Sequence, residues 1–251
     1  MHLNNTSQKS YQSLCKKSFL FILSLIAMTW LTGNAIIGLL ILGMIFFHEY
    51  GHIQAAKYVG IGNRGIYFLP FLGAVALIND IPVQRGMESF IALAGPAYGM
   101  VYSLILAIIA VVFSLPVIGT AAFLCALINL LNLMIPVNPL DGGRIVKNIA
   151  FSIHPLVGIW TMVLANVFAL YLALNGLWIM YIVGFFGYID MIHEIKHRNV
   201  RTNMHGFDIV YSILATIAIS IILSITIFIS MPEKQMPEKQ IDAPQILQAT
   251  R

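Results

Sequence analysis

The chain has 251 residues, of which 59% are hydrophobic and only 10% are charged, and its mean hydropathy is +0.86. A soluble domain usually carries about 25% charged residues, so this composition excludes an ordinary soluble fold and indicates a polytopic membrane protein. The formal net charge of +4 does not indicate nucleic-acid binding, because the basic residues are dispersed among loops. The two cysteines, Cys15 and Cys125, give neither a disulfide framework nor a cysteine-rich zinc site. A zinc site would therefore have to use His and carboxylate ligands.

Seven apolar segments lie along the chain, each near the length that a membrane-spanning helix needs. Their approximate bounds are 18–32, 35–59, 88–113, 116–135, 156–174, 177–192 and 209–230. The first segment is short and follows a polar, lysine-containing stretch, so a signal peptide is an alternative. No clear small-residue cleavage site follows it, which favours a membrane span. We therefore expect an all-α polytopic membrane protein with about seven transmembrane helices.

The segment between the second and third spans breaks this pattern. Gly and Pro interrupt short runs rich in β-forming residues between Arg64 and Ile78, which predicts strands or a short β hairpin. Non-helical backbone at membrane depth is tolerated only where it is buried in protein or lines a wet cavity. A loop on the membrane surface is the alternative on local grounds.

The spans divide the chain into four expected parts. These are a cytoplasmic N-terminal segment at 1–17, a core of six transmembrane helices at 18–208, an additional helix at 209–230 and a tail at 231–251. The tail contains the sequence Met-Pro-Glu-Lys-Gln twice in tandem. This repeat is too short and polar to pack a core, so we expect the tail to be disordered.

The basic residues predict the orientation of the chain in the membrane. With seven spans and a cytoplasmic N-terminus, every Lys and Arg before residue 230 falls on the cytoplasmic side. The loops near 32–35, 114–119 and 174–177 fall on the outside and carry none. This one-sided distribution follows the positive-inside rule. Because no organelle signal is evident, we expect a multi-pass protein of a bacterial cytoplasmic membrane.

The second span carries the motif that points to chemistry. His48, Glu49 and His52 form an H-E-x-x-H pattern that continues an apolar helix from Ala35 to Phe47. Two histidines four residues apart lie on one helix face and can bind one zinc ion, with the glutamate as a proton acceptor. Ionisable residues inside a membrane cost about 2.5–3.5 kcal/mol each and mark functional sites. Histidines reaching from a helix end to the interface are the alternative, but they leave Glu49 unexplained.

A catalytic zinc ion usually has three protein ligands, so the two histidines need a partner. Asp141 is the best candidate, because it follows helix-breaking prolines at the end of an apolar span and precedes two glycines. Its alternative role is an N-cap of a helix that starts at Gly142. The orientation derived from the basic residues puts His48, His52 and Asp141 nearer the cytoplasmic face.

A second H-E-x-x-H pattern occurs at His193, Glu194 and His197. It lies in a charged segment beside Lys196 and Arg198, where charged residues are expected and where the two cations would repel a metal ion. We therefore interpret it as a chance match within a basic cytoplasmic anchor.

The motif at His48–His52 and the stretch around Asp141 together resemble the site-2 protease family of intramembrane zinc metalloproteases. The resemblance rests on His48-Glu49-Tyr50-Gly51-His52 and on the stretch from Asn132 to Arg144, which reads NLMIPVNPLDGGR. It covers roughly residues 35 to 195. It implies that His48, His52 and Asp141 bind one Zn²⁺ ion, that Glu49 is the general base, and that the segment 64–78 is a membrane-associated β segment beside the active site.

The resemblance also implies a substrate and a reaction. We expect hydrolysis of a peptide bond within or next to a transmembrane segment of a membrane-bound protein, with the lipid bilayer as the other partner and no nucleic acid. Substrate-binding roles are expected for Asn132, Asn138 and Gly73. The family often has Asn where this chain has Gly99, so Asn129, Asn132 or Asn138 would have to supply that amide. The alternatives are a catalytically silent relative that binds transmembrane clients and, less in keeping with the scarcity of ionisable groups in the other spans, a metal transporter.

Overall fold

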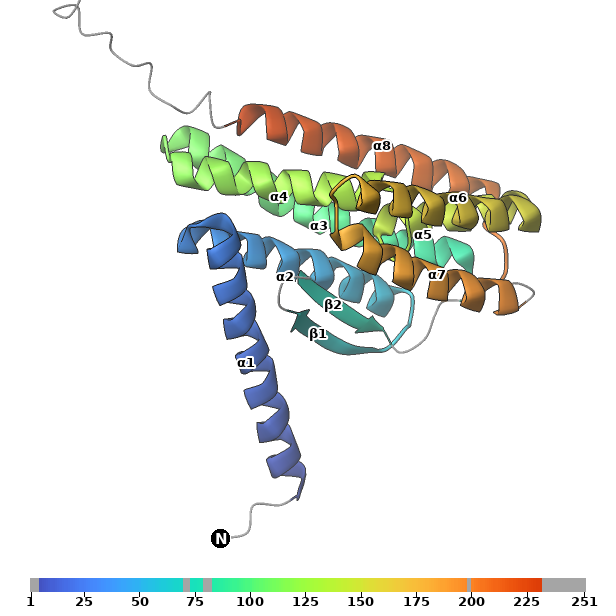
Figure 1. The fold of residues 1–251 in the computed structure, drawn as a ribbon, viewed down its shortest axis with the longest axis horizontal. Coiled ribbons are helices and arrows are strands. Elements are labelled where there is room, and N and C mark those ends of the chain that lie inside the picture. The colour runs from blue at the N-terminus through green and yellow to red at the C-terminus, as the bar shows by residue number, and fades with distance from the viewer. Residues whose placement is uncertain (1–4, 70–72, 79–82, 198–199, 232–251) are drawn as a thin grey trace, which may run out of the picture.

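The structure is a computed structural model that describes residues 5–69, 73–78, 83–197 and 200–231 (Figure 1). These residues form helices and one pair of strands. The helices are α1 (Asn5–Thr32), α2 (Ala35–Tyr58), α3 (Arg85–Val112), α4 (Pro116–Met134), α5 (Asp141–Ile153), α6 (Pro155–Leu174), α7 (Ile179–His197) and α8 (Gly206–Ile229), and the strands are β1 (Asn63–Leu69) and β2 (Gly73–Ile78). The tail predicted to be disordered lies outside the described residues from position 232 onward.

Five of the described helices are long and apolar enough to cross a membrane, namely α2, α3, α4, α6 and α8. They indicate a multi-pass membrane protein, as the composition predicts. The predicted count of seven spans is not confirmed. The apolar part of α1 is limited to Ser18–Thr32, and α7 carries Asp190, Glu194 and Lys196 among its 19 residues. Figure 1 also shows α1 running at a steep angle to the other helices.

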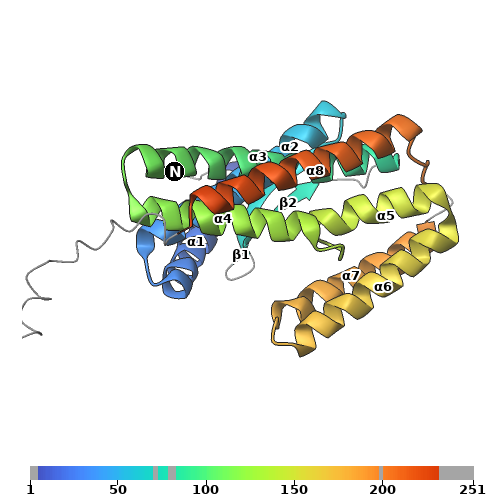
Figure 2. The ribbon, with the colours of Figure 1, turned by 90° about the horizontal axis from the view of Figure 1, so that it is seen from above.

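The helices pack around α3, which contacts α2, α4, α5 and α8. Small side chains at these contacts are almost fully buried, among them Ala92, Ala107, Ala122 and Ala126. Small residues let membrane helices approach closely, which is how such bundles gain van der Waals contact without a strong hydrophobic driving force. The hairpin of α6 and α7 lies to one side of α3, α4 and α8 (Figure 2).

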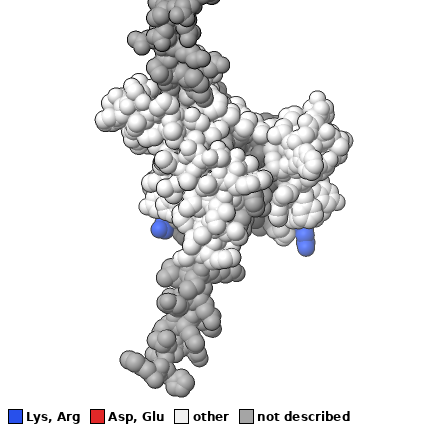
Figure 3. Space-filling model, turned by 60° about the vertical axis from the view of Figure 1, so that its left-hand side comes forward, with Lys and Arg blue, Asp and Glu red and all other residues white. Residues whose placement is uncertain are grey.

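One end of the bundle carries few charges. The α1–α2 and α3–α4 connections and the C-terminal end of α8 lie at the left end of Figure 1. Figure 3 looks toward that end and shows scarcely any charged side chains among the residues described. The charge-free loops near 32–35 and 114–119 thus lie at one end of the molecule. Which side of the membrane this end faces stays a prediction.

The segment expected to be non-helical contains an antiparallel pair of strands. β1 pairs with β2 in a register that joins Leu69 to Gly73 and Asn63 to Ile78, with an irregularity near Asn63 and Gly65. Both strands pack against α2, and β1 also packs against α1. The connecting residues 70–72 lie outside the described residues. The strand pairing agrees with the predicted hairpin, whereas its association with the membrane stays a prediction.

Candidate metal centre

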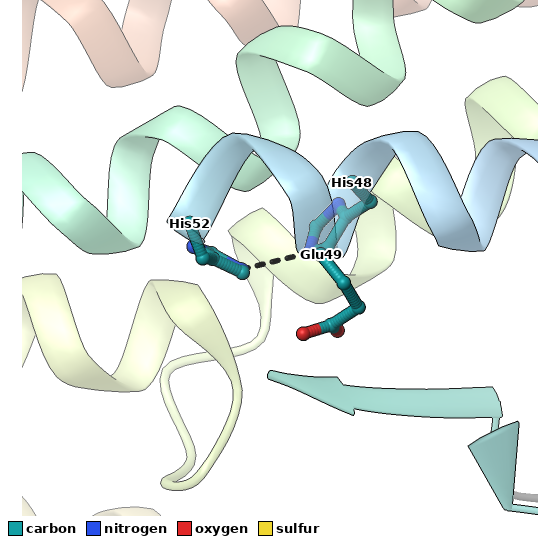
Figure 4. A group of neighbouring side chains, drawn as sticks. All are labelled: His48, Glu49 and His52. Carbon is teal, nitrogen blue, oxygen red and sulfur yellow. Dashed lines mark hydrogen bonds between the residues drawn. The ribbon is translucent and has the colours of Figure 1, made fainter. Parts of the chain in front are cut away.

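Three predicted site residues converge in the interior of the bundle. His48 Nε2 lies 3.0 Å from Asp141 Oδ2 and 3.2 Å from His52 Nε2, and His52 Nε2 lies 3.4 Å from Asp141 Oδ2. All three side chains are buried, and residues 48 and 141 are 93 positions apart in sequence. Figure 4 shows the two imidazole rings meeting on one face of α2, while the Glu49 carboxylate extends away from the helix.

The local structure explains how the two imidazoles reach one point. One turn of α2 separates His48 from His52, so both rings leave the same face of the helix. The rings lie against Gly95 of α3. A Cβ atom at this position would be 2.3 Å from His52 Nε2 and 2.8 Å from His48 Nε2. Any larger residue at 95 would displace the imidazole nitrogens, so Gly95 leaves the space that the two rings occupy.

Asp141 reaches the histidines because the chain breaks between α4 and α5. The segment around Pro136 and Pro139 interrupts the helix, and α5 then begins at Asp141 itself. A Cβ atom at Gly142 would be 2.1 Å from the carbonyl oxygen of Leu133, so this glycine permits the tight return. The alternative interpretation of Asp141 as an N-cap is wrong. The N-cap residue is Leu140, and the Asp141 carboxylate faces the imidazoles.

The outer nitrogens of both imidazoles have oxygen partners. His48 Nδ1 lies 2.8 Å from Asn129 Oδ1, and His52 Nδ1 lies 2.7 Å from the carbonyl oxygen of Ile91. Asn132 Nδ2 donates to Asp141 Oδ2 at 2.7 Å. Metal-binding histidines commonly donate their second ring N–H to an oxygen in this way, which directs the remaining nitrogen toward the metal.

These distances fit a tetrahedral metal ion. Zinc–ligand bonds of about 2.0–2.1 Å place neighbouring ligand atoms about 3.3–3.4 Å apart in a tetrahedron. The three separations here, 3.0, 3.2 and 3.4 Å, are close to that spacing. Two imidazoles and one carboxylate also match the ligand types that catalytic zinc takes, with one position left for water or substrate. His48, Glu49 and His52 also offer ligand atoms that lie within 4.8 Å of one another and could hold a metal ion.

The structure separates the three predicted substrate-binding residues. Asn132 lies at the cluster, with its Nδ2 3.2 Å from His48 Nε2 as well as bonded to Asp141. Asn138 is buried elsewhere and lines a small cavity together with Lys147 and Thr161. Gly73 begins β2, which packs against the helix that carries the histidines. A substrate-binding role for any of the three stays a prediction.

The second H-E-x-x-H pattern has a different geometry. The His193 and His197 rings stack with centroids 4.3 Å apart, and His197 Nδ1 lies 2.9 Å from the carbonyl oxygen of His193. Glu194 is buried instead and accepts hydrogen bonds from Arg85 Nη2 and Arg201 Nη1, both at 2.7 Å. This glutamate therefore neutralises buried cations and does not stand beside a metal site.

Glu194 belongs to a buried ion network that joins α3, α5, α7 and the α7–α8 connection. Its members are Arg85, Glu88, Lys147, Asp190, Glu194 and Arg201. Burial alone would raise the pKa of Glu194, but the positive charges of Lys147, Arg201 and Arg85 outweigh this effect and hold that pKa below its usual value of 4.5. Glu194 is therefore ionised at neutral pH, and the network fixes the end of α7 against α3 and α5.

Sequence reasoning did not single out two groups that support the cluster. The carbonyl oxygen of Ile91 has no sequence signal, because every residue carries one. Gly95 was recognisable only as part of a small-residue segment that lets helices pack closely. Asn129 was one of three candidate amides, and the structure shows it beside His48.

The fold and the cluster together define a multi-pass membrane protein with a buried two-histidine, one-carboxylate group that could hold a metal ion. The chain matches no protein-family model. It is 29% identical over 199 residues to a zinc metalloprotease of Methanocaldococcus jannaschii, covering 73% of this chain and 57% of that protein. It is 34% identical over 131 residues to a provisionally named zinc metalloprotease of Synechocystis sp., covering 49% of this chain and 33% of that protein.

Both relatives are named zinc metalloproteases. The chain spans little more than half the length of the first relative and a third of the second. Two imidazoles and one carboxylate also suit iron(II). A glutamate beside two histidines of one helix turn suits zinc chemistry, in which it acts as the general base.

Proposed function

We propose that this chain is an intramembrane zinc metalloprotease that hydrolyses a peptide bond within or next to a transmembrane segment of a membrane-bound protein. The observation that carries the proposal is that Asp141 of α5 converges with His48 and His52 beside Glu49, and that α2, which carries the last three, is apolar enough to span a membrane. Buried ionisable groups of this kind are expensive inside a membrane and are kept for function.

In this proposal His48, His52 and Asp141 hold one zinc ion. A zinc ion held there would polarise the scissile carbonyl and lower the pKa of a bound water to about 7. The remaining chemistry belongs to the chain. Glu49 lies between the two histidines in sequence and is only partly buried, so its carboxylate can receive a proton from water and deliver it to the leaving amine.

Asn132 has two candidate tasks. It holds the Asp141 carboxylate by a 2.7 Å hydrogen bond, which restricts how that side chain can rotate. Its amide also lies within 3.2 Å of His48 Nε2, close enough to the reacting groups to orient a substrate carbonyl. We propose the first task for the resting protein and the second when substrate is bound.

The strands offer a means of holding the substrate. An intact helix hides its carbonyl groups, so a transmembrane substrate must unwind before cleavage. β2 packs against α2, and its backbone could pair with an extended substrate segment by strand addition near Gly73. We propose that the active site opens toward the cytoplasmic side of a bacterial membrane, based on the one-sided distribution of basic residues.

Removal of the metal provides the test of this proposal. Purified protein should contain about one zinc ion per chain and should cleave a transmembrane reporter in detergent or vesicles. A chelator that strips the zinc should abolish cleavage, and stoichiometric zinc should restore it. Cleavage that persists after complete zinc removal would contradict the proposed function.

A further inference from the structure

Asn129 of α4 lies behind the metal cluster and makes two hydrogen bonds. Its side chain is almost fully buried, at 1% exposure. Its Oδ1 lies 2.8 Å from His48 Nδ1, and its Nδ2 donates to the carbonyl oxygen of Cys125 at 3.1 Å. Both ends of the amide therefore have partners, one on its own helix and one on α2.

These two bonds determine where the proton on His48 lies. A backbone carbonyl can only accept a hydrogen bond, so the amide nitrogen of Asn129 must face Cys125. The amide oxygen then faces His48 and can also only accept. His48 Nδ1 must therefore carry the hydrogen, and in the neutral imidazole Nε2 keeps a free lone pair. That lone pair points to the space shared with His52 and Asp141.

The approach of Asn129 requires a glycine on a third helix. A Cβ atom at Gly99 of α3 would be 2.3 Å from Asn129 Oδ1 and 2.5 Å from its Nδ2. The amide thus fills the space beside Gly99. Any side chain at that position would push the amide away from His48.

We propose that Asn129 is a positioning residue that holds His48 in the Nδ1–H tautomer and in the ring orientation that metal binding needs, and that Gly99 provides the space for it. This role rests on the proposed zinc site, and it assigns to α4 a part in metal binding in addition to the ligand carried by α5. Groups that orient a metal-binding histidine typically change metal affinity by about 10–100-fold when they are removed.

The test measures zinc affinity by competition with a chelator in Asn129→Leu, which keeps the branching and the number of side-chain heavy atoms and removes both hydrogen bonds. The affinity should fall about 10–100-fold while the protein stays folded by size exclusion and thermal unfolding. Asn166→Leu is the matched control. Asn166 also donates to the carbonyl four residues before it, from Nδ2 to Met162 at 2.8 Å, but on α6. Its replacement should leave zinc affinity unchanged.

Two further variants separate positioning from simple packing. Asn129→Asp keeps an acceptor for His48 Nδ1 and loses the bond to Cys125, so it should bind zinc more tightly than Asn129→Leu. Gly99→Ala should weaken zinc binding by displacing the unaltered amide, and combining it with Asn129→Leu should add little further loss.

Three results would overturn this role. They are wild-type zinc affinity in Asn129→Leu, equal losses in the Asp and Leu variants, and full additivity of the changes at 99 and 129. A wild-type chain without any affinity for zinc would instead contradict the proposed metal site and, with it, the role of Asn129.

Discussion

Replacing Asp141 by Ala is expected to remove most of the zinc from the purified protein, as should His48→Ala and His52→Ala. The three ligand atoms lie within 3.0–3.4 Å of one another, so each change removes one corner of a single site. Loss of Asp141 also removes the negative charge that balances a dication in a buried setting. Metal analysis of each variant, per folded chain, gives the measurement.

The second H-E-x-x-H pattern supplies the control for this experiment. His193 and His197 can be changed together to Ala without touching the buried ion network, because the residue between them that joins the network is Glu194. Zinc content should stay at the wild-type value. If Asp141→Ala retained full zinc, the third ligand would lie elsewhere, and a zinc loss in the control equal to that of His52→Ala would reverse the ranking of the two motifs.

Glu49→Gln is expected to separate metal binding from catalysis. The amide keeps the shape of the side chain and one acceptor oxygen but cannot take a proton at neutral pH. Zinc should stay bound, because Glu49 is not one of the three proposed ligands. Turnover of a transmembrane reporter should fall by about 10²–10⁴-fold, the range usually assigned to general acid–base catalysis. The substrate should still bind and should be recoverable as a complex.

The outcome for Glu49→Gln also decides between the two leading functions. A protein that merely binds transmembrane clients needs no general base, so its client binding would be indifferent to this change. Wild-type cleavage rates in Glu49→Gln would show that the proposed mechanism is wrong. Equal client binding, with cleavage absent from both wild type and variant, would favour the client-binding function.

The convergence of His48, His52 and Asp141 was predictable because the signals are local. The spacing of His48 and His52 places both on one face of any helix, and the apolar residues before them make a helix the natural structure. The prolines and glycines around Asp141 likewise signal a chain break and a close approach. The structure then shows the three side chains within hydrogen-bond distance.

Other features depend on contacts between distant segments and could not be predicted in the same way. Asn129, Asn132 and Asn138 are all candidate amides in the sequence, yet Asn129 is the one that lies against His48 Nδ1, because Gly99 leaves space there. The charges near the end of α7 indicated a basic anchor, and their pairing with α3 and α5 in a buried network became visible only in three dimensions. The sequence predicts about seven spans, whereas five of the described helices are long and apolar enough to cross a membrane, and the apolar part of α1 is shorter.

If this chain adds water across a peptide bond of a membrane-embedded substrate, the oxygen of that water must appear in the products. A transmembrane reporter is incubated with the zinc-loaded wild-type protein in vesicles prepared in H₂¹⁸O, and the products are examined by mass spectrometry. We expect two fragments whose masses sum to that of the reporter plus one water, with one ¹⁸O atom in the newly formed carboxyl group. A reporter that stays intact while the protein holds its full zinc and binds the reporter would contradict the account.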